Sequence, residues 1–206
     1  MITNLKTDGW TIVDNFLKED IYKEIIQFVN SYEDNWVDSS TVFPDYLLVD
    51  DKVEVEGKLK VTENNHWNYF KSDNIIGKFQ NQIINYLKEN INLNPDDILP
   101  NFRTRIHKYD NKSALLWHTD KRDFNTMDKH NSNFGYACTL YLNDIWKSNW
   151  GGEILVGDGR WIKPKKNRLF IVDTNVPHKV NMIMKGADIR VSLQTFFTMK
   201  KSLFYS

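Results

Sequence analysis

The half of the chain that follows Pro100 consists of short β-type runs separated by turn residues, and this alternation limits the folds that the chain can adopt. Glycine marks the clearest turns, at residues 150–152, 157–159 and 185–186. Several short strands joined by tight turns favour a β-sandwich or a jelly roll. We expect strands close to residues 101–109, 114–120, 135–143, 153–157, 168–173, 177–183 and 188–198.

The first hundred residues carry helical patterns instead. One apolar stripe at helical spacing starts at Asp20 and comprises Ile21, Ile25, Phe28, Val29 and Tyr32. A second starts near Asp73, comprises Ile76, Phe79, Ile83, Ile84 and Leu87, and should end before Asn94-Pro95. Residues 10–16 are typical of an edge strand, and alternating valines around Gly57 suggest a small hairpin or flap. We therefore predict an α+β fold with N-terminal helices packed on one sheet of a β-sandwich or of a jelly roll (a double-stranded β-helix).

Composition argues against several functional classes. The 27 basic and 27 acidic residues balance, which gives no sign of a nucleic-acid or membrane surface. Cys138 is the single cysteine, so no intrachain disulfide can form and a reducing compartment is expected. The start of the chain lacks the pattern of a signal peptide, and no apolar run approaches the roughly 20 residues that span a bilayer. These features predict a cytoplasmic protein.

Near the end of the second expected strand, His118 and Asp120 form a His-x-Asp pair. Side chains at positions i and i+2 of a strand project from the same face, so this imidazole and this carboxylate point the same way, opposite to Thr119. Such a pair is a weak signal by itself, since it arises readily in a polar strand end. Its meaning depends on what the fold brings near it.

His178 supplies a second imidazole that a jelly roll can bring to the first pair. The residues between Asp120 and His178 are enough for about four short strands. Two imidazoles and one carboxylate hold a non-haem Fe(II) on one face and leave the opposite face open for chemistry. We therefore predict that His118, Asp120 and His178 bind iron. The other histidines, at positions 66, 107 and 130, have no comparable setting and are expected to be structural or solvated, with a substrate contact as the lesser alternative for His107.

Arg190 follows His178 closely and could bind an anion beside the metal. If Lys185-Gly186 is the turn of a hairpin, Arg190 lies opposite Asn181, about 10 Å deeper than His178. That gap suits a short dicarboxylate with one end chelated to the metal and the other held by the guanidinium. Ser192 shares the face of Arg190 and would add a hydroxyl donor. The alternative for a strand arginine is a surface ion pair.

With these residues the chain resembles the 2-oxoglutarate- and Fe(II)-dependent dioxygenases of the prolyl 4-hydroxylase type. The resemblance covers residues 101–198, with a weaker similarity at residues 13–17. The His-x-Asp of the family is matched by His118 and Asp120, and its distal metal histidine by His178. The resemblance implies one dioxygenase domain over residues 1–206, with 1–99 as mainly helical support and flap and 100–198 as a jelly-roll catalytic core.

The resemblance also implies how 2-oxoglutarate is held. The family's strand that runs into Gly-Gly-Glu is matched by residues 139–144 and 151–153, which makes Tyr141 a hydroxyl donor to the distal carboxylate. Arg190 would clamp that carboxylate, as an arginine does in hypoxia-sensing prolyl hydroxylases and many bacterial relatives, where collagen-type enzymes often use lysine.

Several positions depart from the family pattern. Family members often carry Tyr-x-x-Gly-x-x-Tyr-x-x-His before the metal pair. Here Tyr109 keeps the first position and is expected to line the co-substrate pocket, while Lys112 replaces the glycine and Leu115 the second tyrosine. Asn167 stands where a glycine usually follows Pro164, and asparagine tolerates the left-handed backbone that such a turn needs.

The activity that the resemblance implies is hydroxylation of a C–H bond with Fe(II), 2-oxoglutarate and O2, with ascorbate as an optional reductant. Asp120 favours hydroxylation, because related halogenases lack this carboxylate. The leading substrate by analogy is a prolyl or other amino-acid residue of a protein or peptide. Loops around the open metal face would contact it. Candidate contacts are residues 38–66 and 121–133, Arg105, Arg122, Trp146 and Trp161.

Three alternatives stay open at this point. A free amino acid or another small metabolite is almost as plausible a substrate for a chain of this length. A non-catalytic, cupin-like module that only binds metal is also conceivable, but it would not need an arginine and a tyrosine placed as a dicarboxylate clamp. Nucleic-acid demethylation predicts further arginines after His178, and Arg190 is the only one there. The substrate, the oligomeric state and the pathway are not specified by the sequence.

Overall fold

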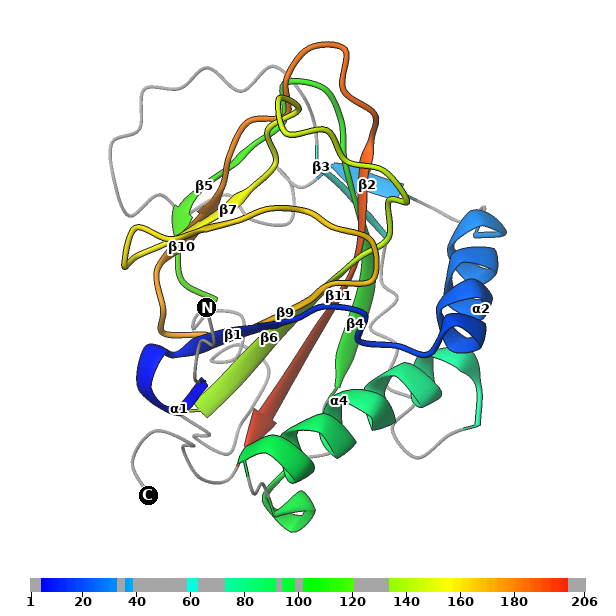
Figure 1. Cartoon of the computed structure of the whole chain (residues 1–206), viewed down its shortest axis with the longest axis vertical. Helices are drawn as coiled ribbons and strands as arrows, with labels where there is room; N and C mark the ends of the chain where they lie inside the picture. Colours follow the sequence, from blue (N-terminus) through cyan, green and yellow to red (C-terminus); the bar gives the residue numbers. More distant parts are fainter. Residues whose placement is uncertain are drawn as a thin grey trace.

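The computed structural model describes residues 5–32, 36–38, 59–62, 73–91, 94–98, 102–120 and 134–199. Within them, two antiparallel sheets form a jelly-roll core (Figure 1). The larger sheet has the order β1 (Trp10–Val13), β9 (Leu169–Asp173), β6 (Phe134–Tyr141), β11 (Arg190–Met199), β4 (Arg103–Tyr109), β3 (Leu59–Thr62) and β2 (Trp36–Asp38). The smaller sheet has the order β5 (Leu115–His118), β10 (His178–Val180), β7 (Ile154–Val156) and β8 (Trp161–Ile162).

Helices cover the outer face of the larger sheet. The long helices are α2 (Glu19–Asn30) and α4 (Ile75–Ile91), which contact each other, and two short ones are α1 (Leu5–Asp8) and the 3-10 helix η1 (Pro95–Asp97). Figure 1 shows α2 and α4 on the side of the larger sheet that faces away from β5, β7 and β10. The helical stripes predicted from the sequence supply the contacts, since Ile25 of α2 and Phe79 of α4 are fully buried. Each large apolar side chain buried in this way contributes roughly 1.5–3 kcal/mol.

The strands of the larger sheet divide their side chains between two separate cores. Residues such as Ile106 and Leu193 pack in the cluster that includes the helices. Tyr109 and Phe196 belong to the second cluster, between the two sheets. Because successive side chains of a strand alternate between faces, one register fixes which residues face the space between the sheets. The functional side chains described below lie on this inner face.

Most of the predicted strands are present, with small shifts at their ends. The predicted edge strand at residues 10–16 is confirmed as β1, at the edge of the larger sheet. β8 was not predicted, because two residues are too few to show a periodicity. The predicted hairpin about Lys185-Gly186 is wrong: β10 and β11 lie in different sheets, and Arg190 lies opposite Tyr109 rather than Asn181. The expected hairpin around Gly57 lies largely outside the described residues.

No helix in the described ranges is both long enough and apolar enough to cross a membrane.

Asn167 joins the N-terminal segment to the jelly roll. Its backbone is left-handed, with φ of 53°, as the turn chemistry predicted. Its side-chain oxygen accepts a 3.0 Å hydrogen bond from the Leu17 N–H, and its amide group donates a 2.8 Å bond to the Leu17 carbonyl. Both bonds are buried, so they fix the entry into α2 against the turn that precedes β9.

Asn167→Ala should therefore lower the free energy of unfolding by about 2–3 kcal/mol, through two lost hydrogen bonds and a strained backbone. Asn167→Gly loses the same bonds but tolerates the positive φ, so its loss should be smaller. Urea unfolding of both variants measures the difference. Equal losses in the two variants would contradict a contribution from the backbone conformation. An unchanged free energy of unfolding in Asn167→Ala would show that neither the hydrogen bonds nor the backbone at this position stabilises the fold.

Candidate metal centre and the pocket behind it

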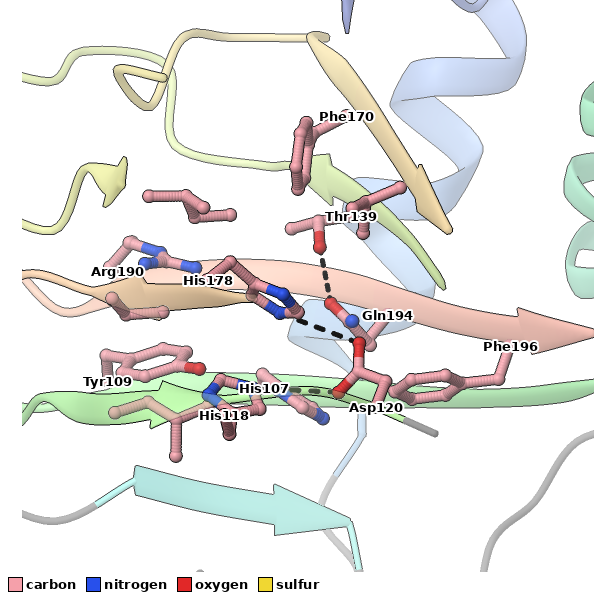
Figure 2. A pocket seen from close by; sticks show the side chains of 14 residues that line it. His107, Tyr109, His118, Asp120, Thr139, Phe170, His178, Arg190, Gln194 and Phe196 are labelled. Carbon is pink, nitrogen blue, oxygen red and sulfur yellow. Dashed lines mark hydrogen bonds and ion pairs between the residues drawn. The ribbon is translucent and has the colours of Figure 1, made fainter. Parts of the chain in front are cut away.

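Three predicted ligands converge at one end of the smaller sheet. His118 ends β5, Asp120 follows it by two residues, and His178 begins β10. His118 and His178 are direct register partners, so their rings share a face, with centroids 4.4 Å apart. One donor atom of each residue lies within 4.8 Å of the others, and all three side chains are buried. Figure 2 shows the carboxylate of Asp120 reaching both imidazoles.

Backbone carbonyls orient the two imidazoles. The Nδ1 atom of His118 lies 2.7 Å from the Leu116 carbonyl oxygen, and that of His178 lies 3.0 Å from the Val176 carbonyl oxygen. A carbonyl only accepts, so Nδ1 carries the proton and Nε2 keeps a free lone pair. Each Nε2 is 3.6 Å from an oxygen of Asp120, too far for a hydrogen bond but suited to a shared cation.

The charges at this cluster fit a bound cation. Burial raises the pKa of the Asp120 carboxyl above its usual value. Burial, together with the nearby His178, lowers the pKa of His118 to about 3, so this ring is neutral at neutral pH. A divalent cation would compensate the buried carboxylate and use the imidazole lone pair. Two nitrogen donors and one carboxylate are the set that suits a non-haem Fe(II), and the residues present fit that ion.

A cavity extends from these ligands between the sheets; its empty volume, part of which is open solvent, is about 590 Å³. Figure 2 shows Arg190 and Tyr109 at one end of it and Gln194 and Phe196 at the other. The residues that line it are His107, Tyr109, Leu115, His118, Asp120, Thr139, Ile154, Phe170, Val172, His178, Val180, Arg190, Gln194 and Phe196.

Arg190 is a buried cation with no acidic partner among the described residues. Only 1% of it is exposed, and its guanidinium carbon lies 4.2 Å from the ring centre of Tyr109 and 5.3 Å from that of Tyr141. It donates a 2.9 Å hydrogen bond to the Gly152 carbonyl. A buried charge without a counterion is strongly destabilising, so this end of the cavity is suited to an anion.

Unpartnered polar atoms surround this guanidinium. The Nε atom of Arg190, the hydroxyl of Tyr141 and the hydroxyl of Ser192 are all buried, with no hydrogen-bond partner in the described part of the chain. Ser192 and Tyr141 are direct neighbours on β11 and β6. Burial raises the pKa of Tyr141, and that of Tyr109 to about 12, so both phenols keep their protons and can donate. The four residues predicted to bind 2-oxoglutarate therefore lie together.

Gly152 leaves room for Arg190. Its φ is +73°, and an added Cβ would lie 2.5 Å from Ile183 Cδ1 and 3.2 Å from Arg190 Cδ. The Gly-Gly turn therefore allows the chain to pass close to the guanidinium that its carbonyl binds.

The residues predicted to touch substrate are scattered. Arg105 is buried on β4 opposite Gln194, but it does not line the cavity. Trp146 donates a 2.9 Å hydrogen bond to the Gly151 carbonyl and packs edge-on against Trp150. Trp161 lies on β8 with 51% of its surface exposed. Arg122 lies outside the described residues. None of Arg105, Trp146 and Trp161 lines the cavity that contains the metal ligands.

Three polar cavity residues were not predicted as part of the site. His107, expected to be structural or solvated, is buried in the cavity wall. The Thr139 hydroxyl donates a 2.5 Å hydrogen bond to the side-chain oxygen of Gln194. Strand register carries the signal that would have found them, since His107 lies opposite Ser192, and Thr139 opposite Gln194. Register cannot be read from one strand alone.

Comparisons with known proteins agree with this geometry. The sequence model of the 2OG-Fe(II) oxygenase superfamily matches residues 104–198. No curated protein sequence matches the chain. Among solved structures, a prolyl 4-hydroxylase from Pseudomonas putida is 16% identical with a TM-score of 0.62, and 96% of each chain is covered.

Two further structures share the fold. A Trichoplax adhaerens prolyl hydroxylase, solved with a peptide fragment of the hypoxia inducible factor oxygen degradation domain, is 18% identical with a TM-score of 0.61, covering 95% of this chain and 86% of that one. HygX from Streptomyces hygroscopicus, solved with nickel and 2-oxoglutarate, is 8% identical with a TM-score of 0.60, covering 95% and 84%. Residues 104–198 thus match the 2OG-Fe(II) oxygenase superfamily in sequence, and the chain shares its fold with the prolyl 4-hydroxylases.

Proposed function

We propose that this protein is an Fe(II)- and 2-oxoglutarate-dependent dioxygenase that hydroxylates a C–H bond of a prolyl or other amino-acid residue in a protein or peptide. The observation that carries the proposal is the pairing of two features in one cavity, a cluster of three metal-ligand residues and a buried arginine for which the described residues provide no counterion. A module that only binds metal needs no buried anion receptor, which argues against a non-catalytic role.

The proposal assigns the site residues as follows. His118, Asp120 and His178 hold the metal through two Nε2 atoms and a carboxylate. Arg190 binds the distal carboxylate of 2-oxoglutarate, while Tyr109 packs against its guanidinium. The hydroxyls of Tyr141 and Ser192 donate to the same carboxylate. When bound, Fe(II), 2-oxoglutarate and O2 supply the oxidation: one oxygen atom enters the substrate, and 2-oxoglutarate becomes succinate and carbon dioxide.

The protein's own contribution is positioning, charge matching and exclusion of water. The backbone carbonyls of Leu116 and Val176 fix both imidazoles before any ion binds, and Ile154, Phe170 and Val172 give the cavity an apolar wall. The cationic end of the cavity orients the dicarboxylate so that its keto acid end faces the metal. The other end, beside Gln194 and Phe196, is left for the substrate.

A single assay tests both the reaction and the substrate class. The protein is incubated with Fe(II), 2-oxoglutarate, ascorbate and air, together with either proline-containing peptides or free amino acids and related metabolites. Succinate release and mass spectrometry for one added oxygen atom are the readouts. We expect peptide-dependent succinate and a hydroxylated residue. Hydroxylation of free amino acids alone would contradict the peptide assignment, and absence of 2-oxoglutarate binding would contradict the dioxygenase itself.

A further inference from the structure

His107 is a polar residue of the cavity that the function proposed above does not use. It lies on β4 directly opposite Ser192 of β11, and Ser192 lies directly opposite Tyr141 of β6. Side chains of directly paired residues project from the same face of a sheet. His107, Ser192 and Tyr141 therefore form one row across three neighbouring strands. The adjacent row contains Arg190, which is paired with Tyr109.

Every residue in this row has a buried polar atom that finds no hydrogen-bond partner among the residues described by the structure. These atoms are Nε2 of His107 and the two hydroxyl oxygens, and Nε of Arg190 is a fourth. An unsatisfied buried polar group costs about 1–3 kcal/mol, and such groups are rare in native proteins. Four of them in two adjacent rows indicate a missing ligand rather than four independent defects. A carboxylate offers about four acceptor positions on two oxygens, which matches this number.

The state of the His107 ring is compatible with a donor role. Burial, with the positive charges of Arg105 and Arg190, lowers the pKa of His107 to about 3. The ring is therefore neutral at physiological pH and carries one N–H, which can occupy Nε2. A neutral donor adds a hydrogen bond to the anion without placing a further positive charge beside two arginines.

We propose that His107 donates a hydrogen bond from Nε2 to the distal carboxylate of 2-oxoglutarate, beside Tyr141, Ser192 and Arg190. This inference rests on the proposed function, because it takes 2-oxoglutarate as the ligand of the cavity. It assigns a co-substrate contact to a position that the sequence pattern alone did not single out.

The test is calorimetric titration of Mn(II)-loaded protein, which binds the ligand without turnover. Each protein is titrated with 2-oxoglutarate and with 2-oxovalerate, which has the same keto acid end but a methyl group in place of the distal carboxylate. His107→Leu should weaken 2-oxoglutarate binding by about 10- to 100-fold, the range for a hydrogen bond to a charged group. Binding of 2-oxovalerate should be unchanged.

Two further variants separate the hydrogen bond from packing. In His107→Gln the side-chain amide can reach the place of Nε2, so 2-oxoglutarate affinity should return most of the way. In His107→Asn the amide is too short, so the affinity should stay low. The comparison of His107→Gln with His107→Asn tests the hydrogen bond even if His107→Leu fails to fold. Equal weakening of both ligands, unaltered 2-oxoglutarate affinity in His107→Leu or His107→Asn, or no recovery in His107→Gln would each overturn the inference.

Arg190→Leu in the same titration distinguishes this inference from the function on which it rests. If Arg190→Leu leaves 2-oxoglutarate affinity unaltered, the proposed function fails. If Arg190→Leu weakens binding while the His107 variants do not, only the role of His107 is overturned.

Discussion

Asp120→Ala should abolish oxygen-dependent turnover and weaken Fe(II) binding by more than about 100-fold, because it removes the anionic donor from the three-residue cluster. Anaerobic Fe(II) titration measures the affinity, and succinate release measures turnover. Asp158→Ala is the matched control. Asp158 accepts a hydrogen bond from Trp10 Nε1 and pairs with Arg160, and it does not line the cavity. Undiminished iron binding in Asp120→Ala would show that the carboxylate is not a ligand.

The same variant should not lose stability when metal is absent. The raised pKa of Asp120 means that the folded state disfavours its ionised form, so without metal this group adds most stability below its unfolded pKa and loses it as pH rises. At neutral pH, metal-free Asp120→Ala should therefore melt no lower than the metal-free parent. A large drop in melting temperature would indicate a structural role instead.

Arg190→Leu should weaken 2-oxoglutarate binding by roughly 30-fold or more while leaving iron affinity nearly unchanged, since removing one member of a buried charge pair costs about 2–5 kcal/mol. The two affinities should respond differently because Arg190 lies at the end of the cavity. It contacts Tyr109 and Gly152 rather than the metal ligands. Titration of Mn(II)-loaded protein with 2-oxoglutarate gives the affinity.

The matched control for Arg190 is Arg168→Leu. Arg168 is also largely buried, but its Nε donates a 2.6 Å bond to Asp14, and this pair holds the pKa of Asp14 near 2. Arg168→Leu should lower stability and leave 2-oxoglutarate affinity unchanged. If both arginine variants weaken the ligand equally, general loosening of the fold explains the loss, and the anion site at Arg190 is contradicted.

The sequence predicted which residues form each helix and strand better than it predicted which strands lie side by side. Glycine turns separate strands visibly, so β4 to β7 and β9 to β11 lie close to their predicted ranges. The apolar stripes likewise predicted α2 and α4. Pairing between β10 and β11 was wrong because a jelly roll sends consecutive strands to opposite sheets, and a local turn signal does not distinguish that crossover from a hairpin.

The functional site could likewise be predicted only in part, because some of its residues are defined by strand pairing. Some residues of the site can be recognised in the sequence alone because their types are rare in strands: His118, Asp120, His178 and Arg190. The fold brings them to one cavity. His107 did not stand out, because its place depends on β4 pairing with β11 and on a row that only three strands together define. The substrate contacts stay a prediction, since no periodicity determines the positions of the loops that would surround the open metal face.

The pairing of His118 with His178 has a mechanical consequence. β5 is a short strand at the edge of the smaller sheet, and among the described strands β10 is its only neighbour. An ion held by one imidazole from each strand acts as a cross-link between them, and a slip of one residue would turn an imidazole to the opposite face. On the proposed assignment of the ligands, iron content and the alignment of β5 with β10 are therefore coupled, so loss of the ion would also loosen the register of the two strands that carry the imidazoles.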